Sequence, residues 1–220
     1  PLNGRNFEYM GEDPYLSSIM VVPYIKGVQE NGVAACVKHY ALNNQEFNRH
    51  TTNVHLSDRA LYEIYLPAFK AAVQEGGAWA IMGAYNLYSF SEDTDSGKLY
   101  KTQHACHNKR LLQDILRKEW GFDGIVMTDW WAKSNYEGYQ AEVPVKAPMV
   151  AAQNDIYMVV SDAKANPEND DVEEMLHAGK ITVGELQRNT ANILGFLLKS
   201  PSVLLLTDRI CKEELEAMNK

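Results

Sequence analysis

The stretch VAACVKHY (residues 33–40) is a short apolar run that turns polar at its end, and runs of the same kind follow it along the chain. WAIMGAYN (79–86) and GIVMTD (124–129) have the same character, and the three runs begin roughly 45 residues apart. Short apolar runs bounded by turn residues indicate buried strands. We therefore expect three such strands and a fourth over 155–160 (DIYMVV).

Helical patterns separate these runs. Asp13-Pro14 can open a helix that Asn31-Gly32 ends, with an apolar stripe made of Tyr15, Ile19, Val22 and Ile25. Thr182 and Glu185 form a capping-box pattern at the start of another helix. That helix covers residues 183–198, and the remaining expected helices cover residues 58–75, 109–120, 172–178 and 208–218.

Alternation of apolar strands with helices predicts an α/β fold, with a parallel sheet covered by helices. The strand spacing favours a (β/α)8 TIM-type barrel, of which only about the second half to two-thirds lies in this chain, because a closed barrel needs eight strands. A doubly wound open sheet stays an alternative, although no GxGxxG follows a strand. We expect residues 1–200 to form the partial barrel and residues 201–220 to form a C-terminal tail helix.

The composition limits the classes of partner. The net charge of −8 argues against nucleic acid and anionic membranes, and no apolar stretch is long enough to span a bilayer. Three cysteines without a CxxC pair are compatible with a reducing compartment, with the cytoplasm favoured, and Cys36 is expected to be buried. No cofactor or metal is expected. The chain does not begin with Met, and we expect it to be a fragment.

Polar residues lie at the ends of three predicted strands: Lys38-His39, Tyr85-Asn86 and Thr128-Asp129. In a (β/α) barrel the carboxyl ends of the strands meet at the mouth of one cavity. A charge at such a position is costly to bury unless it is paired or functional. The sequence therefore predicts one site that contains Lys38, His39, Tyr85 and Asp129.

Four blocks of sequence around these residues resemble the signature blocks of family 3 glycoside hydrolases. They are GRNFEYMGEDPYL (4–16), VKHYALNNQEFNR (37–49), IMGAYN (81–86) and GFDGIVMTDWWA (121–132). All four occur in the family's order and at family-like spacings, and the resemblance extends from residue 4 to about residue 200. It implies a β-glucosidase type of enzyme.

The resemblance also implies a role for each site residue. Asp129 matches the nucleophile of a retaining mechanism, in which a second carboxylic acid protonates the leaving oxygen and then activates water. Trp130 matches a residue that flanks the aglycone, and Arg49 is expected to support the sugar-binding groups. The residues that match the sugar-binding −1 subsite are Arg5, Lys38, His39 and Tyr85.

Some parts of the family's site have no match here. The family's acid/base comes from a second α/β domain in β-glucosidases, or from a loop after KHFPGHG in its β-hexosaminidases, and this chain has KHYALNN instead. We expect the missing barrel strands, the proton donor and an early sugar-binding aspartate to lie outside this chain. The expected substrate is a terminal β-glucoside or an oligosaccharide.

Several other interpretations remain. A β-xylosidase is the nearest alternative, although Trp after the nucleophile is more typical of the glucosidases. A non-catalytic sugar-binding fragment is the second, and a Schiff-base aldolase using Lys38 is the third. His104-Ala-Cys106-His107 resembles a metal cluster but is expected to be a solvent-exposed loop, and Trp131 is expected to serve packing only.

Overall fold

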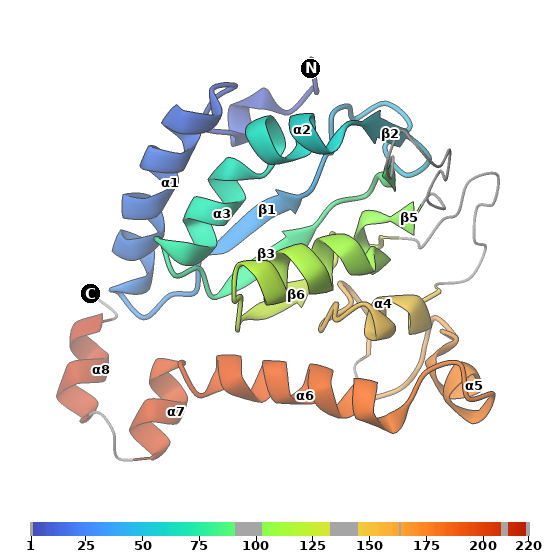
Figure 1. Ribbon diagram of the computed structural model, residues 1–220. Coiled ribbons are helices and arrows are strands. Elements are labelled where there is room, and N and C mark those ends of the chain that lie inside the picture. Colours follow the sequence, from blue (N-terminus) through green and yellow to red (C-terminus); the bar gives the residue numbers. More distant parts are fainter. Residues whose placement is uncertain (1, 91–102, 133–144, 163, 208–210, 219–220) are drawn as a thin grey trace.

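A parallel three-stranded sheet forms the centre of the chain. The computed structural model describes residues 2–90, 103–132, 145–162, 164–207 and 211–218 (Figure 1). The sheet consists of β1 (Cys36–Tyr40), β3 (Ala80–Gly83) and β6 (Ile125–Met127), in the order β1-β3-β6. The three predicted strands are thus confirmed. The fourth, over 155–160, is wrong in extent, because it is reduced to one parallel bridge between Ile156 and Met127.

Three helices cover one face of this sheet: α1 (Pro14–Gln29), α3 (Pro67–Gln74) and η4 (Arg110–Glu119) (Figure 1). The main core joins Tyr40, Ile81 and Val126 of the strands to the apolar side chains of η4. Successive right-handed crossovers that advance one strand at a time place their helices on the same face. This arrangement is consistent with a segment of a (β/α) barrel, whereas a doubly wound sheet carries helices on both faces.

The helix predicted over 58–75 is interrupted. It consists of α2 (Asp58–Ala60), the π-helical η2 (Leu61–Tyr65) and then α3, which starts at Pro67. Proline has no N–H and its ring clashes with the carbonyl four residues earlier, which disfavours a regular α-helix through Pro67 and suits the start of a new helix there. The N–H of Leu66 donates to the oxygen of Leu61, five residues back. The N-cap at Ser57 is confirmed by its bond from the N–H of Ala60.

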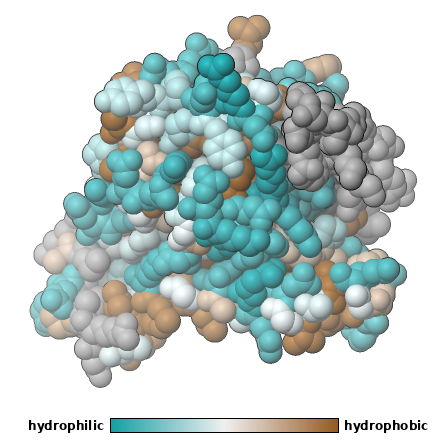
Figure 2. Space-filling view, in the orientation of Figure 1, coloured by the Kyte–Doolittle hydropathy of each residue, from teal (hydrophilic) through white to brown (hydrophobic). Residues whose placement is uncertain are grey.

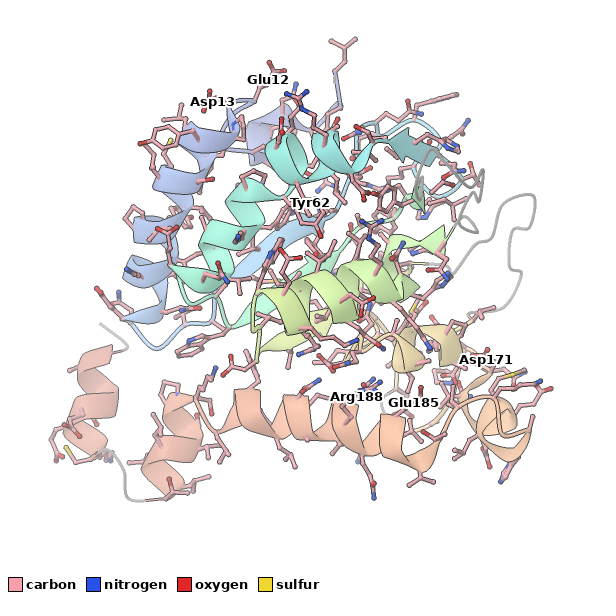
Figure 3. The ribbon with its side chains drawn as sticks, in the orientation of Figure 1. Glu12, Asp13, Tyr62, Asp171, Glu185 and Arg188 are labelled. Carbon is pink, nitrogen blue, oxygen red and sulfur yellow. The ribbon has the colours of Figure 1, made fainter. Side chains whose placement is uncertain are left out.

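Helix α1 begins as predicted but buries only part of the predicted stripe, at Val22 and Ile25. The carboxylate of Asp13, at the start of the helix (Figure 3), accepts a hydrogen bond from the N–H of Leu16. Val21 and Ile25 pack against α3. The predicted stripe is wrong at Tyr15 and Ile19, which are exposed. Neither residue belongs to the apolar cluster that Val21 and Ile25 form with α3.

A second small sheet was not predicted. It pairs β2 (Asn53–Leu56) in parallel with β4 (Leu87–Phe90), and β4 antiparallel with β5 (Gln103–His104). A short 3-10 turn, η3 (Ala105–His107), follows β5, and both His104 and Cys106 in this region are fully buried. The expectation of an exposed loop here is wrong, because β5 docks the segment against the core. Cys36, in contrast, is exposed rather than buried.

The C-terminal half is helical, with α4 (Ala147–Ala151), α5 (Val172–His177), α6 (Val183–Leu197), α7 (Pro201–Leu206) and α8 (Lys212–Met218). The predicted α5, α6 and the capping box at Thr182 are confirmed, whereas α7 was not predicted. The predicted start of the tail helix at Asp208 lies outside the described residues, and the division at residue 200 stays a prediction.

The surface is mixed in character. The face over α3 and η4 is mainly hydrophilic, and hydrophobic side chains reach the surface over α6 and α7 (Figure 2). Within the described ranges, no helix is both long and apolar enough to cross a membrane.

Candidate active site

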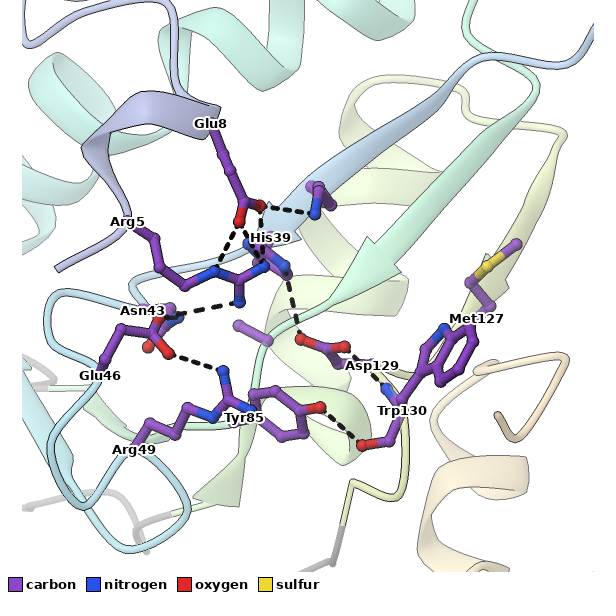
Figure 4. Close-up of polar contacts among 12 residues, drawn as sticks. Arg5, Glu8, His39, Asn43, Glu46, Arg49, Tyr85, Met127, Asp129 and Trp130 are labelled. Atoms are coloured by element: carbon purple, nitrogen blue, oxygen red, sulfur yellow. Dashed lines mark hydrogen bonds and ion pairs between the residues drawn. The ribbon is translucent and has the colours of Figure 1, made fainter. Parts of the chain in front are cut away.

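Asp129 lies two residues after the end of β6 and is buried, with 6% of its surface exposed. Its Oδ1 accepts a hydrogen bond of 2.7 Å from the N–H of Trp130, which orients the carboxylate. Its Oδ2 lies 3.4 Å from Nε2 of His39 and accepts no hydrogen bond from any of the described residues (Figure 4). The carboxylate is therefore held in one orientation, and its Oδ2 has no hydrogen-bond donor among the described residues.

His39 lies at the end of β1 and faces this oxygen. Burial lowers the pKa of His39 to about 4, although the negative charge of Asp129 opposes that shift. The imidazole is therefore neutral at pH 7 and carries one proton. The hydroxyl of Tyr9 lies 2.6 Å from Nδ1. A tautomer in which Nδ1 accepts from Tyr9 places the single proton on Nε2, the nitrogen that lies nearer Asp129.

Tyr85, just after β3, lies on the other side of the carboxylate. Its hydroxyl donates a 2.6 Å hydrogen bond to the carbonyl oxygen of Trp130. Burial, followed by the charge of Asp129, raises the pKa of Tyr85, so this hydroxyl stays protonated. The guanidinium of Arg49 lies over the Tyr85 ring at 4.2 Å, a cation–π contact that holds the ring in place.

Glu8 joins two of the predicted sugar-binding cations. Nε and Nη2 of Arg5 donate to its two oxygens at 2.7 and 2.8 Å, and Nζ of Lys38 donates to Oε2 at 2.7 Å. These hydrogen bonds, first from Arg5 and then from Lys38, lower the pKa of Glu8 to about 2. An ammonium held in this way is a poor Schiff-base nucleophile, which argues against the aldolase alternative.

Glu46, like Glu8, binds cationic side chains, and it lies on the opposite side of the cluster. It accepts hydrogen bonds from Nη1 of Arg49 at 2.6 Å and from the side-chain amide of Asn43 at 2.9 Å. Its carboxylate also lies 3.9 Å from the Arg5 guanidinium. Glu46 thus links the Arg49–Tyr85 pair to the Arg5–Glu8 pair (Figure 4).

Trp130 borders the site on its open side. Its side chain is about half exposed and meets the ring of Trp131 edge-on at 5.4 Å between centroids. Trp131 is itself 55% exposed in the described structure, and the expectation that it serves packing only stays a prediction. Two adjacent exposed indoles are a suitable surface for stacking against a sugar ring.

The structure brings all the predicted site residues into one cluster. Lys38, His39, Tyr85 and Asp129 come from the ends of β1, β3 and β6, as parallel strands require. The prediction missed Glu8, Tyr9 and Glu46. A signal for two of them was available, since Glu8 lies three residues after Arg5 and Glu46 three residues before Arg49. Among the described residues, no group of three or more potential ligands is arranged for a metal ion.

Comparison with known proteins places this geometry in context. The glycosyl hydrolase family 3 N-terminal domain matches residues 1–195. A β-glucosidase of Bacteroides ovatus is 64% identical over 141 residues, which are 64% of this chain and 17% of that protein. An exo-α-(1→6)-L-arabinopyranosidase of Bifidobacterium longum is 39% identical over 168 residues, which are 76% of this chain and 21% of that protein.

A solved structure also matches. The crystal structure of a β-glucosidase from Paenibacillus barengoltzii superposes with a TM-score of 0.81 at 47% identity, covering 91% of this chain and 21% of that one. The chain therefore spans about a fifth of the length of these proteins.

Proposed function

This chain belongs to glycosyl hydrolase family 3, and from that membership we propose that it supplies the nucleophile and part of the sugar pocket of a retaining, exo-acting β-glycosidase. The proposed substrate is a terminal, non-reducing β-D-glucosyl residue. One observation carries the proposal: the buried Asp129 has an oxygen without a hydrogen bond from any described residue, beside His39 and Tyr85 and next to the ion pairs of Arg5 and Arg49 (Figure 4).

The proposed reaction has two steps. Oδ2 of Asp129 forms a bond to the anomeric carbon while the bond to the leaving oxygen breaks, and a proton donor protonates that oxygen. Water, activated by the same group as a base, then displaces Asp129, so the sugar leaves with its original anomeric configuration. His39 and the free N–H groups of Lys38 and Arg5 donate hydrogen bonds to the sugar hydroxyls.

The proton donor comes from outside the described residues. The two other carboxylates of the cluster are occupied, because Glu8 binds Arg5 and Lys38 and Glu46 binds Arg49. A carboxyl whose pKa is about 2, as in Glu8, holds no proton to donate at neutral pH. We propose that a second α/β domain supplies this acid/base, at about 5–5.5 Å from the nucleophile as in other retaining enzymes.

Further strands complete the barrel in this proposal. In the described residues β1 is paired only with β3. A pocket of about 760 Å³, lined by residues of β1, α1 and η1 (Asn6–Glu8), lies beside the other edge of β1. An unpaired parallel edge beside an apolar helix face is the place where another strand of a parallel sheet adds.

The substrate assignment rests on the relatives. The Bacteroides and Paenibacillus proteins are named β-glucosidases, and Trp130 after the nucleophile favours a glucoside over a xyloside. The arabinopyranosidase of Bifidobacterium longum makes L-arabinopyranosides the second substrate to test. Sugar binding without turnover is a second candidate function, favoured by the lack of an unoccupied acid among the described residues.

A mechanism-based 2-deoxy-2-fluoroglucoside tests the proposal in the intact protein that carries this chain. We expect peptide mapping to find the label on Asp129, and Asp129→Ala to lower kcat/KM by at least about a thousandfold. Asp123→Ala is the matched control, because the Asp123 side chain is 79% exposed and forms only a surface pair with Lys199 in the described structure. Label on another residue, or normal turnover by Asp129→Ala, would refute the proposal.

A further inference from the structure

We propose that Glu8 is a positioning and specificity-determining residue of this site: it holds Arg5 and Lys38 and offsets one of their two positive charges, so that both recognise sugar hydroxyls and the pocket rejects sugars that carry a carboxylate. The inference rests on the proposed function, since it concerns the same sugar pocket. It adds a role to a residue that makes no direct contact with Asp129 in the described structure.

The geometry of Glu8 is that of a bridge. Arg5 engages it in a two-pronged arrangement, and Lys38 shares the oxygen that Nη2 of Arg5 binds. Arg5 has five N–H donors and Lys38 has three, so both keep donors for a substrate after binding Glu8. Glu8 therefore fixes the direction of two long, flexible side chains without using up their hydrogen-bonding capacity.

The charges of the cluster balance. Arg5, Lys38 and Arg49 bring three positive charges and Glu8, Glu46 and Asp129 bring three negative ones, and in the described structure Glu8 and Glu46 make the ion pairs with these cations. His39 adds no charge at pH 7, because burial holds its pKa near 4. The charges of Arg5, Glu8 and Lys38 all act on His39, so these groups share one electrostatic environment with the nucleophile.

A substrate carboxylate would disturb this balance. In a glucuronide the hydroxymethyl group of glucose is replaced by a carboxylate, which would bring a fourth negative charge into the cluster. Arg5 and Lys38 are the cations that could attract it, but Glu8 binds both at 2.7–2.8 Å and offsets one of their charges, and Glu46 lies 3.9 Å from Arg5. With Glu8 present, a neutral sugar is favoured; without its charge, the two cations become a carboxylate site.

The replacement Glu8→Gln tests this, because it keeps the shape and removes the charge. We compare kcat/KM for p-nitrophenyl β-glucoside and p-nitrophenyl β-glucuronide in the intact protein. We expect glucoside kcat/KM to fall about tenfold, because the three charge-assisted hydrogen bonds that orient Arg5 and Lys38 are weakened and one contact to the sugar is lost. The ratio of glucuronide to glucoside kcat/KM is expected to rise at least tenfold, and Glu8→Asp should restore a low ratio.

Glu12→Gln is the matched control. Glu12 is an exposed carboxylate at the start of α1 (Figure 3), and none of the described ion pairs includes it. Its removal changes the net charge equally but should leave the ratio unchanged. A purely structural role for Glu8 would lower both activities together and leave the ratio the same, and that result overturns the inference.

Failure of the proposed function can be told apart from failure of this inference. If the intact protein hydrolyses no aryl glycoside, the proposed function fails. Calorimetric titration with glucose and with glucuronate then decides the role of Glu8. A shift of at least tenfold toward glucuronate in Glu8→Gln supports the role, and an unchanged preference overturns it.

Discussion

Asp155 is the residue whose replacement should most strongly destabilise the strand that carries the candidate nucleophile. Its side chain is fully buried, and its Oδ2 accepts hydrogen bonds from Nη2 of Arg117 at 2.6 Å and from the N–H of Val126 at 2.8 Å. Its Oδ1 accepts a bond of 2.8 Å from the side-chain amide of Asn192. One carboxylate thus ties together η4, β6 and α6.

The expected loss follows from these contacts. Asp155→Ala leaves the Arg117 guanidinium, whose side chain is 9% exposed, without its counter-charge. Removing one partner of a buried ion pair costs about 3–5 kcal/mol. For a domain of this size, that loss lowers Tm by roughly 10 °C. Asp155→Asn keeps an acceptor and should cost less, about 1–3 kcal/mol.

Urea unfolding followed by tryptophan fluorescence, together with calorimetry, measures the change. Asp123→Ala is the exposed control and should stay within about 0.5 kcal/mol of wild type. The double replacement Arg117→Met with Asp155→Leu should recover most of the loss, because no buried charge is left unpaired. An Asp155→Ala protein within about 1 kcal/mol of wild type would refute the reasoning.

The remaining predictions concern packing and pH. A Cβ added at Gly124 would clash with the carbonyl oxygen of Trp79, so Gly124→Ala should lower the free energy of unfolding by about 3 kcal/mol. Gly27→Ala in α1, where nothing lies within 4 Å, should raise it by about 0.5–1 kcal/mol in the same urea assay. The pKa of His39 is near 4 in the folded protein and 6.5 in the unfolded chain. The neutral imidazole therefore contributes about 3 kcal/mol to the free energy of unfolding above pH 6.5, and this contribution is lost as the pH falls toward 4. Stability of His39→Gln should therefore fall less than that of wild type between pH 7 and pH 4, and equal slopes in urea titrations would contradict this prediction.

Much of the candidate site could be predicted from local sequence. Lys38, Tyr85 and Asp129 each follow an apolar run, and strand ends of a parallel sheet converge at one edge. The starts of α1 and α6 were also predictable, because Asp13 and Thr182 bind N–H groups only three residues away. Such contacts depend on the chain within one turn.

Other features depend on residues far apart in the sequence. Glu8 meets Lys38 across thirty positions, as does Tyr9 with His39. Both contacts require the segment before α1 to fold back over the end of β1, and no local pattern encodes that path. The burial of Cys106, the exposure of Cys36 and the exposure of Tyr15 likewise depend on which element packs beside each residue.

The amino-acid sequence alone determined the strand–helix order, the main capping residues and the chemical groups at the strand ends, because these follow from backbone hydrogen bonding and apolar periodicity over a few residues. Only the tertiary structure decided which charges neutralise one another. Glu8 forms an ion pair with Arg5 and Glu46 forms one with Arg49, while one oxygen of Asp129 stays without a hydrogen bond from the described residues. Ion pairing depends on distances in space, which the packing of the sheet and its preceding loops sets.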